Sequence, residues 1–263
     1  MSSLWYPSVK QAPMSMGGMG GVVGSYNFRS AGSSECGPAS GSVFYNADEN
    51  LHVSGGAMQV YNFDSNNSFC VEAFIKMDTM SRWNYVALRW DGSSNYNRIW
   101  RFGVSSNNLL TFQGNISCTQ SSQNMTTDTW YHVAAVREGS TQGYSNYLRL
   151  YVNGVDVGNN SGSGSSMESN YTPISIGANA ESTNYSMRGY ISNLRITVNE
   201  PVYTTAFDPP TCTLTTTSQG VTESNVRLLC CQSTSDVTAS THLQAGTISI
   251  DNGAPTASST QPF

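Results

Sequence analysis

The stretch from Thr127 to Gly158 constrains the fold of this chain more than any other part of it. Its first run, Trp130–Arg137, is short and rich in β-branched and aromatic residues, which favours a strand over a helix. Its second run, Tyr147–Val152, alternates as a strand with one buried face does. The dipeptide Asn153-Gly154 favours a type I′ hairpin turn, because both residues accept positive φ. The stretch therefore predicts three antiparallel strands through the middle of a sheet.

Short runs of the same kind recur along the chain, separated by turns rich in Gly, Ser and Asn. In the run Ser68–Lys76, alternation predicts that Phe69, Val71, Ala73 and Ile75 share one face, and that Cys70, Glu72, Phe74 and Lys76 share the other. Val226–Cys230 is expected to be the last strand. No stretch predicts a helix with confidence. This pattern indicates an all-β, two-layer antiparallel sandwich.

Two motifs within the central stretch carry a family resemblance. The sequences Trp130-Tyr131-His132-Val133-Ala134 and Tyr151-Val152-Asn153-Gly154 resemble laminin-G-like domains, which are jelly-roll sandwiches of the concanavalin-A-like class. Ile174–Gly177 and Gly189–Ile196 continue the resemblance in the same order. The closing segment Val202–Thr211, followed by Leu228-Leu229-Cys230-Cys231-Gln232, resembles virion proteins of marine and cyanobacterial tailed phages. The resemblance implies a jelly roll in a virion structural protein.

Three regions are expected along the chain. Residues 1–40 form an extended N-terminal arm, 41–232 the sandwich and 233–263 a C-terminal extension. The Gly-rich arm is either a loose terminus or a segment that lies in a groove on a partner subunit. Its apolar anchors in the second case are Trp5, Tyr6, Met14, Met16, Met19 and Phe28. The extension, with one alternating run at Thr247–Ile250, either adds an edge strand, packs on a neighbour or forms a loose tail.

The charge composition excludes one class of partner. Only 11% of the residues are charged, lysine occurs at Lys10 and Lys76 alone, and the net charge is −5. Nucleic-acid binding is therefore not expected, because it needs clustered Lys and Arg. The N-terminus lacks the pattern of a signal peptide, and no apolar run approaches the ~20 residues that span a bilayer. We expect synthesis in the host cytoplasm and no membrane insertion.

The six cysteines permit 15 pairings, between which the sequence does not choose. In a protein assembled in the cytosol, buried thiols are favoured over disulfides. The adjacent Cys230 and Cys231 are expected to point to opposite faces of a strand.

The sequence holds no pattern typical of a catalytic site. Glycosidases of this fold need two carboxylates across a cleft, whereas Glu72 is isolated and Glu138 and Glu181 have no acidic neighbour at strand spacing. The three histidines are far apart, and His132 is expected to be packed and hydrogen-bonded within the sheet. We therefore expect a protein that is not an enzyme.

Two kinds of binding site remain. Calcium, the one cofactor that the sequence suggests, would take oxygen ligands from Asp64, Asn66 and Asp91, although loop Asp and Asn residues more often stabilise turns. Carbohydrate would use tyrosines in polar loops, although packing of such side chains over neighbouring loops or subunits is the more common arrangement. The candidates are Tyr96, Tyr144, Tyr171 and Tyr185.

These expectations combine into one functional hypothesis and one alternative. The first is a non-enzymatic structural protein on the exterior of a phage particle, as a capsid decoration or a tail or fibre component. Its arm would attach it to other virion proteins or to copies of itself, with a trimer as the expected homo-oligomer. The alternative is a calcium- or carbohydrate-binding lectin-type adhesin that recognises host surface polysaccharide.

Overall fold

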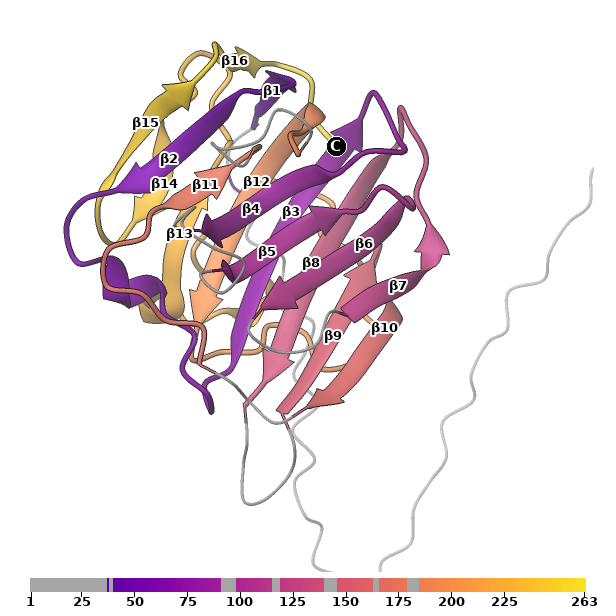
Figure 1. Ribbon diagram of the computed structural model, residues 1–263, viewed down its shortest axis with the longest axis vertical. Coiled ribbons are helices and arrows are strands. Elements are labelled where there is room, and N and C mark those ends of the chain that lie inside the picture. The colour runs from indigo at the N-terminus through magenta and orange to yellow at the C-terminus, as the bar shows by residue number, and fades with distance from the viewer. Residues whose placement is uncertain are drawn as a thin grey trace, which may run out of the picture. The chain divides into compact units, whose positions relative to one another are not determined.

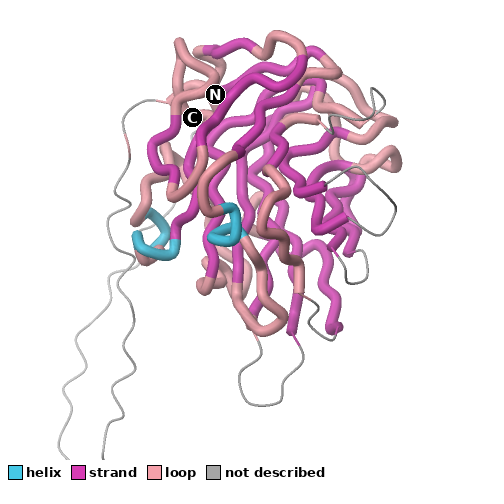
Figure 2. Tube along the Cα trace, turned by 60° about the vertical axis from the view of Figure 1, so that its left-hand side comes forward, coloured by secondary structure: helices cyan, strands magenta, loops and turns pink. Residues whose placement is uncertain are grey.

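The computed structural model describes residue 37 and residues 40–90, 98–114, 119–139, 146–162, 166–178 and 185–263. Two antiparallel sheets pack face to face in these residues (Figure 1). Strands and loops make up almost all of the described chain, with helix confined to short 3-10 turns (Figure 2). The predicted all-β, two-layer jelly-roll sandwich is confirmed. None of the helices in the described residues is long and apolar enough to cross a membrane.

The larger sheet has nine strands among the described residues, in the order β10-β9-β8-β3-β12-β1-β16, with β13 paired to β12 and β14 paired to β13. Its strands are β1 (Ser42–Asn46), β3 (Phe69–Met77), β8 (Trp130–Glu138), β9 (Asn146–Val152), β10 (Val155–Gly162), β12 (Arg188–Val198), β13 (Val226–Cys230), β14 (Ser240–Leu243) and β16 (Thr256–Ser258).

The smaller sheet has the order β15-β2-β11-β4-β5-β6-β7. Its strands are β2 (Asn50–Ser54), β4 (Asn84–Trp90), β5 (Arg98–Val104), β6 (Leu109–Gly114), β7 (Thr119–Asn124), β11 (Ile174–Ile176) and β15 (Thr247–Asn252). The 3-10 turns are η1 (Met58–Tyr61), η2 (Ser218–Gly220) and η3 (Glu223–Asn225).

The core lies between the sheets and follows the period-two pattern. On β3, Phe69, Val71, Ala73 and Ile75 all belong to the main core cluster, as the sequence predicted. The ring of Phe63 stacks on that of Phe69 with 4.1 Å between centroids. Alternate side chains of the same strand therefore point to the outer face of the larger sheet, where function-bearing groups can lie.

A segment that we call the strap, residues 199–217, crosses this outer face. Tyr203 and Phe207 of the strap stack on each other at 3.6 Å and cover Tyr151 of β9. The strap docks on the predicted hairpin turn, where Asn153 and Gly154 have φ of 49° and 78°. The amide of Phe207 donates to the carbonyl of Gly154 at 3.0 Å, and a Cβ on Gly154 would lie 1.8 Å from the Phe207 carbonyl oxygen. The glycine is thus required both by the turn and by the strap.

The strand order corrects two sequence-based expectations. The run β8-β9-β10 ends the larger sheet, with β10 at its edge, so the three strands do not lie in the middle. Nor is β13 the last strand, because β14, β15 and β16 follow it. Residues 233–263 thereby add three strands: β15 beside β2 in the smaller sheet, and β14 beside β13 and β16 beside β1 in the larger sheet. They belong to the same compact unit as the sandwich, Ser33–Phe263.

The cysteines also differ in part from expectation. Cys70, Cys230 and Cys231 are buried free thiols, as predicted. Cys212 is disulfide-bonded, so the prediction that the cysteines are free thiols is wrong at this residue. Pairing depends on the tertiary approach of distant segments, which spacing does not reveal. The prediction that Cys230 and Cys231 face opposite ways is also wrong: β13 ends at Cys230, Cys231 takes a φ of 61°, and the two sulfurs lie 3.7 Å apart in the core.

Candidate functional site

Many of the residues predicted to form sites lie outside the described part of the chain. Of the calcium candidates, Asp64 and Asn66 are described and Asp91 is not. Of the carbohydrate candidates, Tyr171 and Tyr185 are described. The remaining predicted residues, which lie outside the described ranges, are Tyr96, Tyr144, Trp5, Tyr6, Met14, Met16, Met19 and Phe28.

The two described tyrosines have different surroundings. Tyr171 is 89% exposed and makes no ring contact with any described residue. Tyr185 is 39% exposed and lies against the ring of Tyr85, with 6.2 Å between centroids. The backbones of Tyr185 and Trp83 form a parallel bridge. The structure therefore brings only Tyr185 into an aromatic cluster.

We call this cluster of Trp83, Tyr85, Tyr185 and Arg101 the aromatic platform. Trp83 and Tyr85 are 5.5 Å apart, and the guanidinium carbon of Arg101 lies 4.4 Å from the centre of the Trp83 ring. Arg101 Nη1 donates to the Tyr85 hydroxyl at 2.8 Å. Arg101 alternates on β5 with core residues, so it points to the outer face of the smaller sheet. The platform combines partly exposed aromatic faces with a cation held by stacking.

The loop proposed for calcium is organised differently. The Asp64 carboxylate accepts from the side-chain Nδ2 of Asn67 at 3.0 Å, and the Asp64 carbonyl accepts from the backbone amide of Asn67 at 3.2 Å, which closes a turn. The backbone carbonyls of Asp64 and Asn67 accept from the buried guanidinium of Arg137. Burial lowers the pKa of Arg137 to about 10, with Asp64 acting in the opposite direction, so the guanidinium stays charged near neutral pH.

One carboxylate near this loop was not foreseen. The side chain of Glu168 hydrogen-bonds to that of Asp64, and this contact raises the pKa of Glu168. Two carboxylates beside a guanidinium fall short of the six to eight oxygens that calcium takes. Within the described ranges no group of three or more His, Cys, Asp or Glu side chains is arranged to hold a metal. The proposal for Asp64, Asn66 and Asp91 stays a prediction, because Asp91 lies outside the described residues.

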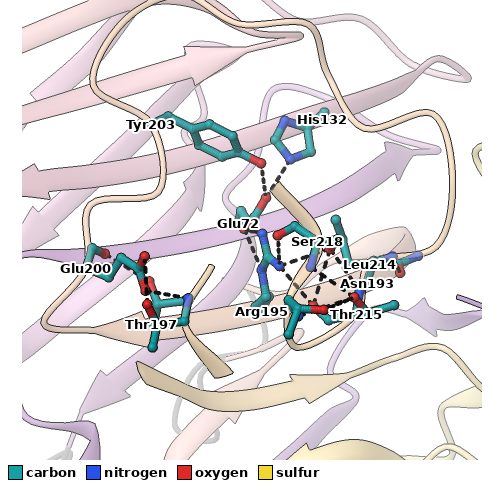
Figure 3. Close-up of polar contacts among 12 residues, drawn as sticks. Glu72, His132, Asn193, Arg195, Thr197, Glu200, Tyr203, Leu214, Thr215 and Ser218 are labelled. Atoms are coloured by element: carbon teal, nitrogen blue, oxygen red, sulfur yellow. Dashed lines mark hydrogen bonds and ion pairs between the residues drawn. The ribbon is translucent and has the colours of Figure 1, made fainter. Parts of the chain in front are cut away.

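The strongest polar cluster is buried beneath the strap (Figure 3). Glu72 on β3 accepts from Arg195 Nε on β12 at 2.8 Å, from His132 Nε2 on β8 at 3.0 Å, and from the Tyr203 hydroxyl at 2.8 Å. Arg195 Nη2 lies 2.6 Å from the same carboxylate. We call these four residues the Glu72 network, and none is more than 5% exposed.

Burial by itself raises the pKa of Glu72, but Arg195 and His132 outweigh it and lower that pKa to about 2. Burial, and then the Glu72 charge, raise the pKa of Tyr203 well above its usual value. The cluster is therefore an ionised carboxylate surrounded by donors. A base or nucleophile needs access to substrate, so the arrangement is suited to fastening the strap.

The strap's far end is held by the same guanidinium. Arg195 Nη1 donates to the carbonyls of Thr215 and Ser218, both at 2.9 Å. Sequence reasoning correctly expected His132 to be packed and hydrogen-bonded, but it described Glu72 as isolated. The partners of Glu72 lie 60 to 131 residues away along the chain, so no local signal reveals them.

Comparison with known proteins agrees with this architecture. The laminin G family model described as the "Concanavalin A-like lectin/glucanases superfamily" matches residues 53–199, more than half of the chain. The chain belongs to this superfamily. No curated protein matches it.

Two solved structures with TM-scores of 0.50 or more share the sandwich fold at low identity, and a third is more distant. A native heptameric SAP-like pentraxin from Limulus polyphemus has a TM-score of 0.50 at 16% identity, covering 83% of this chain and 95% of its own. A "putative carbohydrate binding protein" from Bacteroides ovatus has a TM-score of 0.52 at 15% identity, covering 83% and 61%. Domains LG4-5 of the mouse laminin α1 chain reach 0.41 at 16%, covering 65% and 45%. At these identities the likeness shows the fold alone.

Proposed function

We propose that this chain is a non-enzymatic recognition domain that binds carbohydrate and is displayed on the outside of a phage particle. The aromatic platform is the observation that carries the binding part. Tyr185 and Trp83 offer apolar ring faces to the C–H face of a sugar, and Arg101 offers donors to its hydroxyl or carboxylate groups. Membership of a superfamily of lectins and glucanases supports the ligand class.

Five of the described carboxylates are already engaged by other side chains, which supports binding without hydrolysis. A glycosidase needs two carboxyl groups about 5 to 9.5 Å apart with a sugar between them. Glu72 is sealed in its network, and Asp64 and Glu168 are hydrogen-bonded directly to each other, which leaves no room for substrate. Glu138 and Asp156 are both paired with Arg149. Each of these groups already has another role.

The virion part of the proposal rests on the closing segment of the chain. Val202–Thr211, which resembles phage virion proteins, forms the strap, so the segment contributes to the fold and is not an optional tail. A surface with few charges and little lysine suits a protein that packs at high density beside its copies. We further propose attachment through residues 1–40, contacts with other virion proteins and a homotrimer. Immunogold labelling of intact particles tests the location, and absence from the particle surface refutes it.

A glycan array of the full chain tests carbohydrate recognition. We expect Tyr185→Ala and Trp83→Ala to lower the apparent affinity for bound glycans at least about tenfold, a loss of ~1.4 kcal/mol. Tyr171→Ala is the matched control, because this side chain is exposed and lies outside the platform. A parallel array with chelator tests the predicted calcium site, since loss of binding that calcium restores would support it. An array with no bound glycan, or equal losses for all three variants, refutes the platform.

A further inference from the structure

A cavity lies beside the strap, on the side of the sandwich opposite to the aromatic platform. It has a volume of about 270 Å³ and opens on the outer face of the larger sheet. Its floor is made by cross-strand neighbours, Phe74 of β3 and His132 of β8, together with Trp130. Pro210 of the strap and Phe263 form walls. Much of the wall lies outside residues 53–199, the part shared with the superfamily.

His132 is held rigidly where it lines this cavity. Its ring packs against Phe74 at 4.9 Å and edge-on against Tyr203 and Phe207 at 5.9 and 5.7 Å. Because the carboxylate of Glu72 is ionised, it can only accept, so His132 Nε2 carries a hydrogen. The other ring nitrogen, Nδ1, is buried and has no hydrogen-bond partner among the described residues. Because Nδ1 has almost no accessible surface, the imidazole gives the cavity a ring surface and no hydrogen bond.

The remaining lining sets the chemistry of what can enter. Three prolines, two phenylalanines and a tryptophan surround the cavity, and no Asp, Glu, Lys or Arg lines it. One amide is available at the rim: Asn153 Oδ1 accepts from the His132 backbone amide at 2.9 Å, which leaves its Nδ2 to donate. The volume lies below the ~300–1,000 Å³ typical of drug-sized ligands, so it suits a single ring.

We infer that this cavity binds a neutral terminal pyranose of a glycan, whose apolar face packs on Trp130 and Phe263 and whose hydroxyl accepts from Asn153 Nδ2 at the rim. The inference rests on the proposed carbohydrate recognition and adds a site separate from the aromatic platform. The absence of lining charge disfavours acidic sugars here, whereas Arg101 on the platform can accept them.

Saturation-transfer NMR on the full chain tests the cavity, with the methyl glycosides of fucose, rhamnose, galactose and glucuronate as probes. We expect transfer to at least one neutral glycoside, and weaker binding, by about tenfold, in Trp130→Ala and Phe263→Ala. Phe263 is 41% exposed and Trp130 is outside the Glu72 network, so neither change should unfold the protein.

The platform variant Tyr185→Ala separates the two proposals, because it should keep binding in the cavity. If sugars bind and only Tyr185→Ala weakens them, the cavity assignment is wrong and the proposed function stands. The cavity assignment is overturned if no neutral glycoside receives saturation. It is also overturned if glucuronate is the preferred ligand and Phe263→Ala binds glucuronate as the wild type does. If no sugar binds in either assay, both proposals fail.

Discussion

Replacement of Glu72 by Gln should destabilise the fold more than any other Glu→Gln or Asp→Asn substitution in the described residues. The glutamine amide keeps one acceptor oxygen and turns a donor group towards Arg195, His132 or Tyr203, each of which now donates to the carboxylate. Arg195 then becomes a buried charge without a counter-ion. Breaking a buried ion pair from one side costs about 3 to 5 kcal/mol of the free energy of unfolding.

The pKa of Glu72 gives an independent figure of similar size. The carboxyl titrates at about 2 in the folded chain, against an ordinary value of 4.5. Lowering a pKa by roughly 2.5 adds about 3 to 4 kcal/mol to the free energy of unfolding at neutral pH, since a pKa change of one corresponds to ~1.4 kcal/mol. Because the folded pKa is lowered, this stabilisation is present above pH 4.5 and disappears as the pH falls towards 2. The gap between wild type and Glu72→Gln should therefore narrow in that window.

Urea unfolding followed by tryptophan fluorescence measures both effects. Glu138→Gln is the control, since Glu138 pairs with Arg149 at a partly exposed position and should contribute only about 0 to 1 kcal/mol. At pH 7 we expect Glu72→Gln to unfold at a clearly lower urea midpoint than the control. If its free energy of unfolding lies within 1 kcal/mol of wild type, or if the gap stays constant down to pH 2, the network does not fasten the strap.

Three further predictions concern the turn, the cysteines and the arm. Gly154→Ala should lower the free energy of unfolding by at least ~3 kcal/mol, because the added methyl group meets the strap. Gly55 has a similar φ but open space around it, so Gly55→Ala should cost only about 1 to 2 kcal/mol. Equal urea midpoints for the two variants would contradict this. Peptide mapping of the denatured chain without reductant should find Cys212 in a cross-linked peptide, and should find Cys70, Cys230 and Cys231 as free thiols. Alkylation of Cys212 under these conditions would contradict the disulfide. Deletion of residues 1–35 should leave a folded sandwich that no longer joins particles, and normal incorporation would exclude the arm as the attachment device.

The sequence was most informative where side-chain alternation and turn chemistry act locally. The faces of β3, the I′ turn at Asn153-Gly154 and the jelly-roll class all follow from period-two burial and positive φ. Strands β7 (TQSSQN) and β16 (TAS) lack any apolar alternation, and they are fixed by backbone pairing with β6 and β1. Pairing of this kind leaves no local signature.

The candidate sites were less predictable, because they are assembled from distant segments. Tyr185 could be singled out as a tyrosine in a polar loop, but its neighbours Trp83 and Arg101 come from elements about 100 and 84 residues earlier. The same holds for the cavity at His132, whose wall includes Pro210 and Phe263. The sequence also did not indicate that Glu168 lies beside Asp64, whereas Asp91, which we predicted as a calcium ligand with Asp64 and Asn66, lies outside the described residues.

Affinity electrophoresis through a gel that contains host surface polysaccharide measures at once whether the chain binds this polysaccharide and whether it cleaves it. Retardation of the band reports binding, and staining of the same gel for intact polysaccharide reports cleavage. We expect the full chain to be retarded, Tyr185→Ala to be retarded less, and the polysaccharide around the band to stay intact. A cleared zone around the band, or migration unaffected by every host polysaccharide tried, would contradict it.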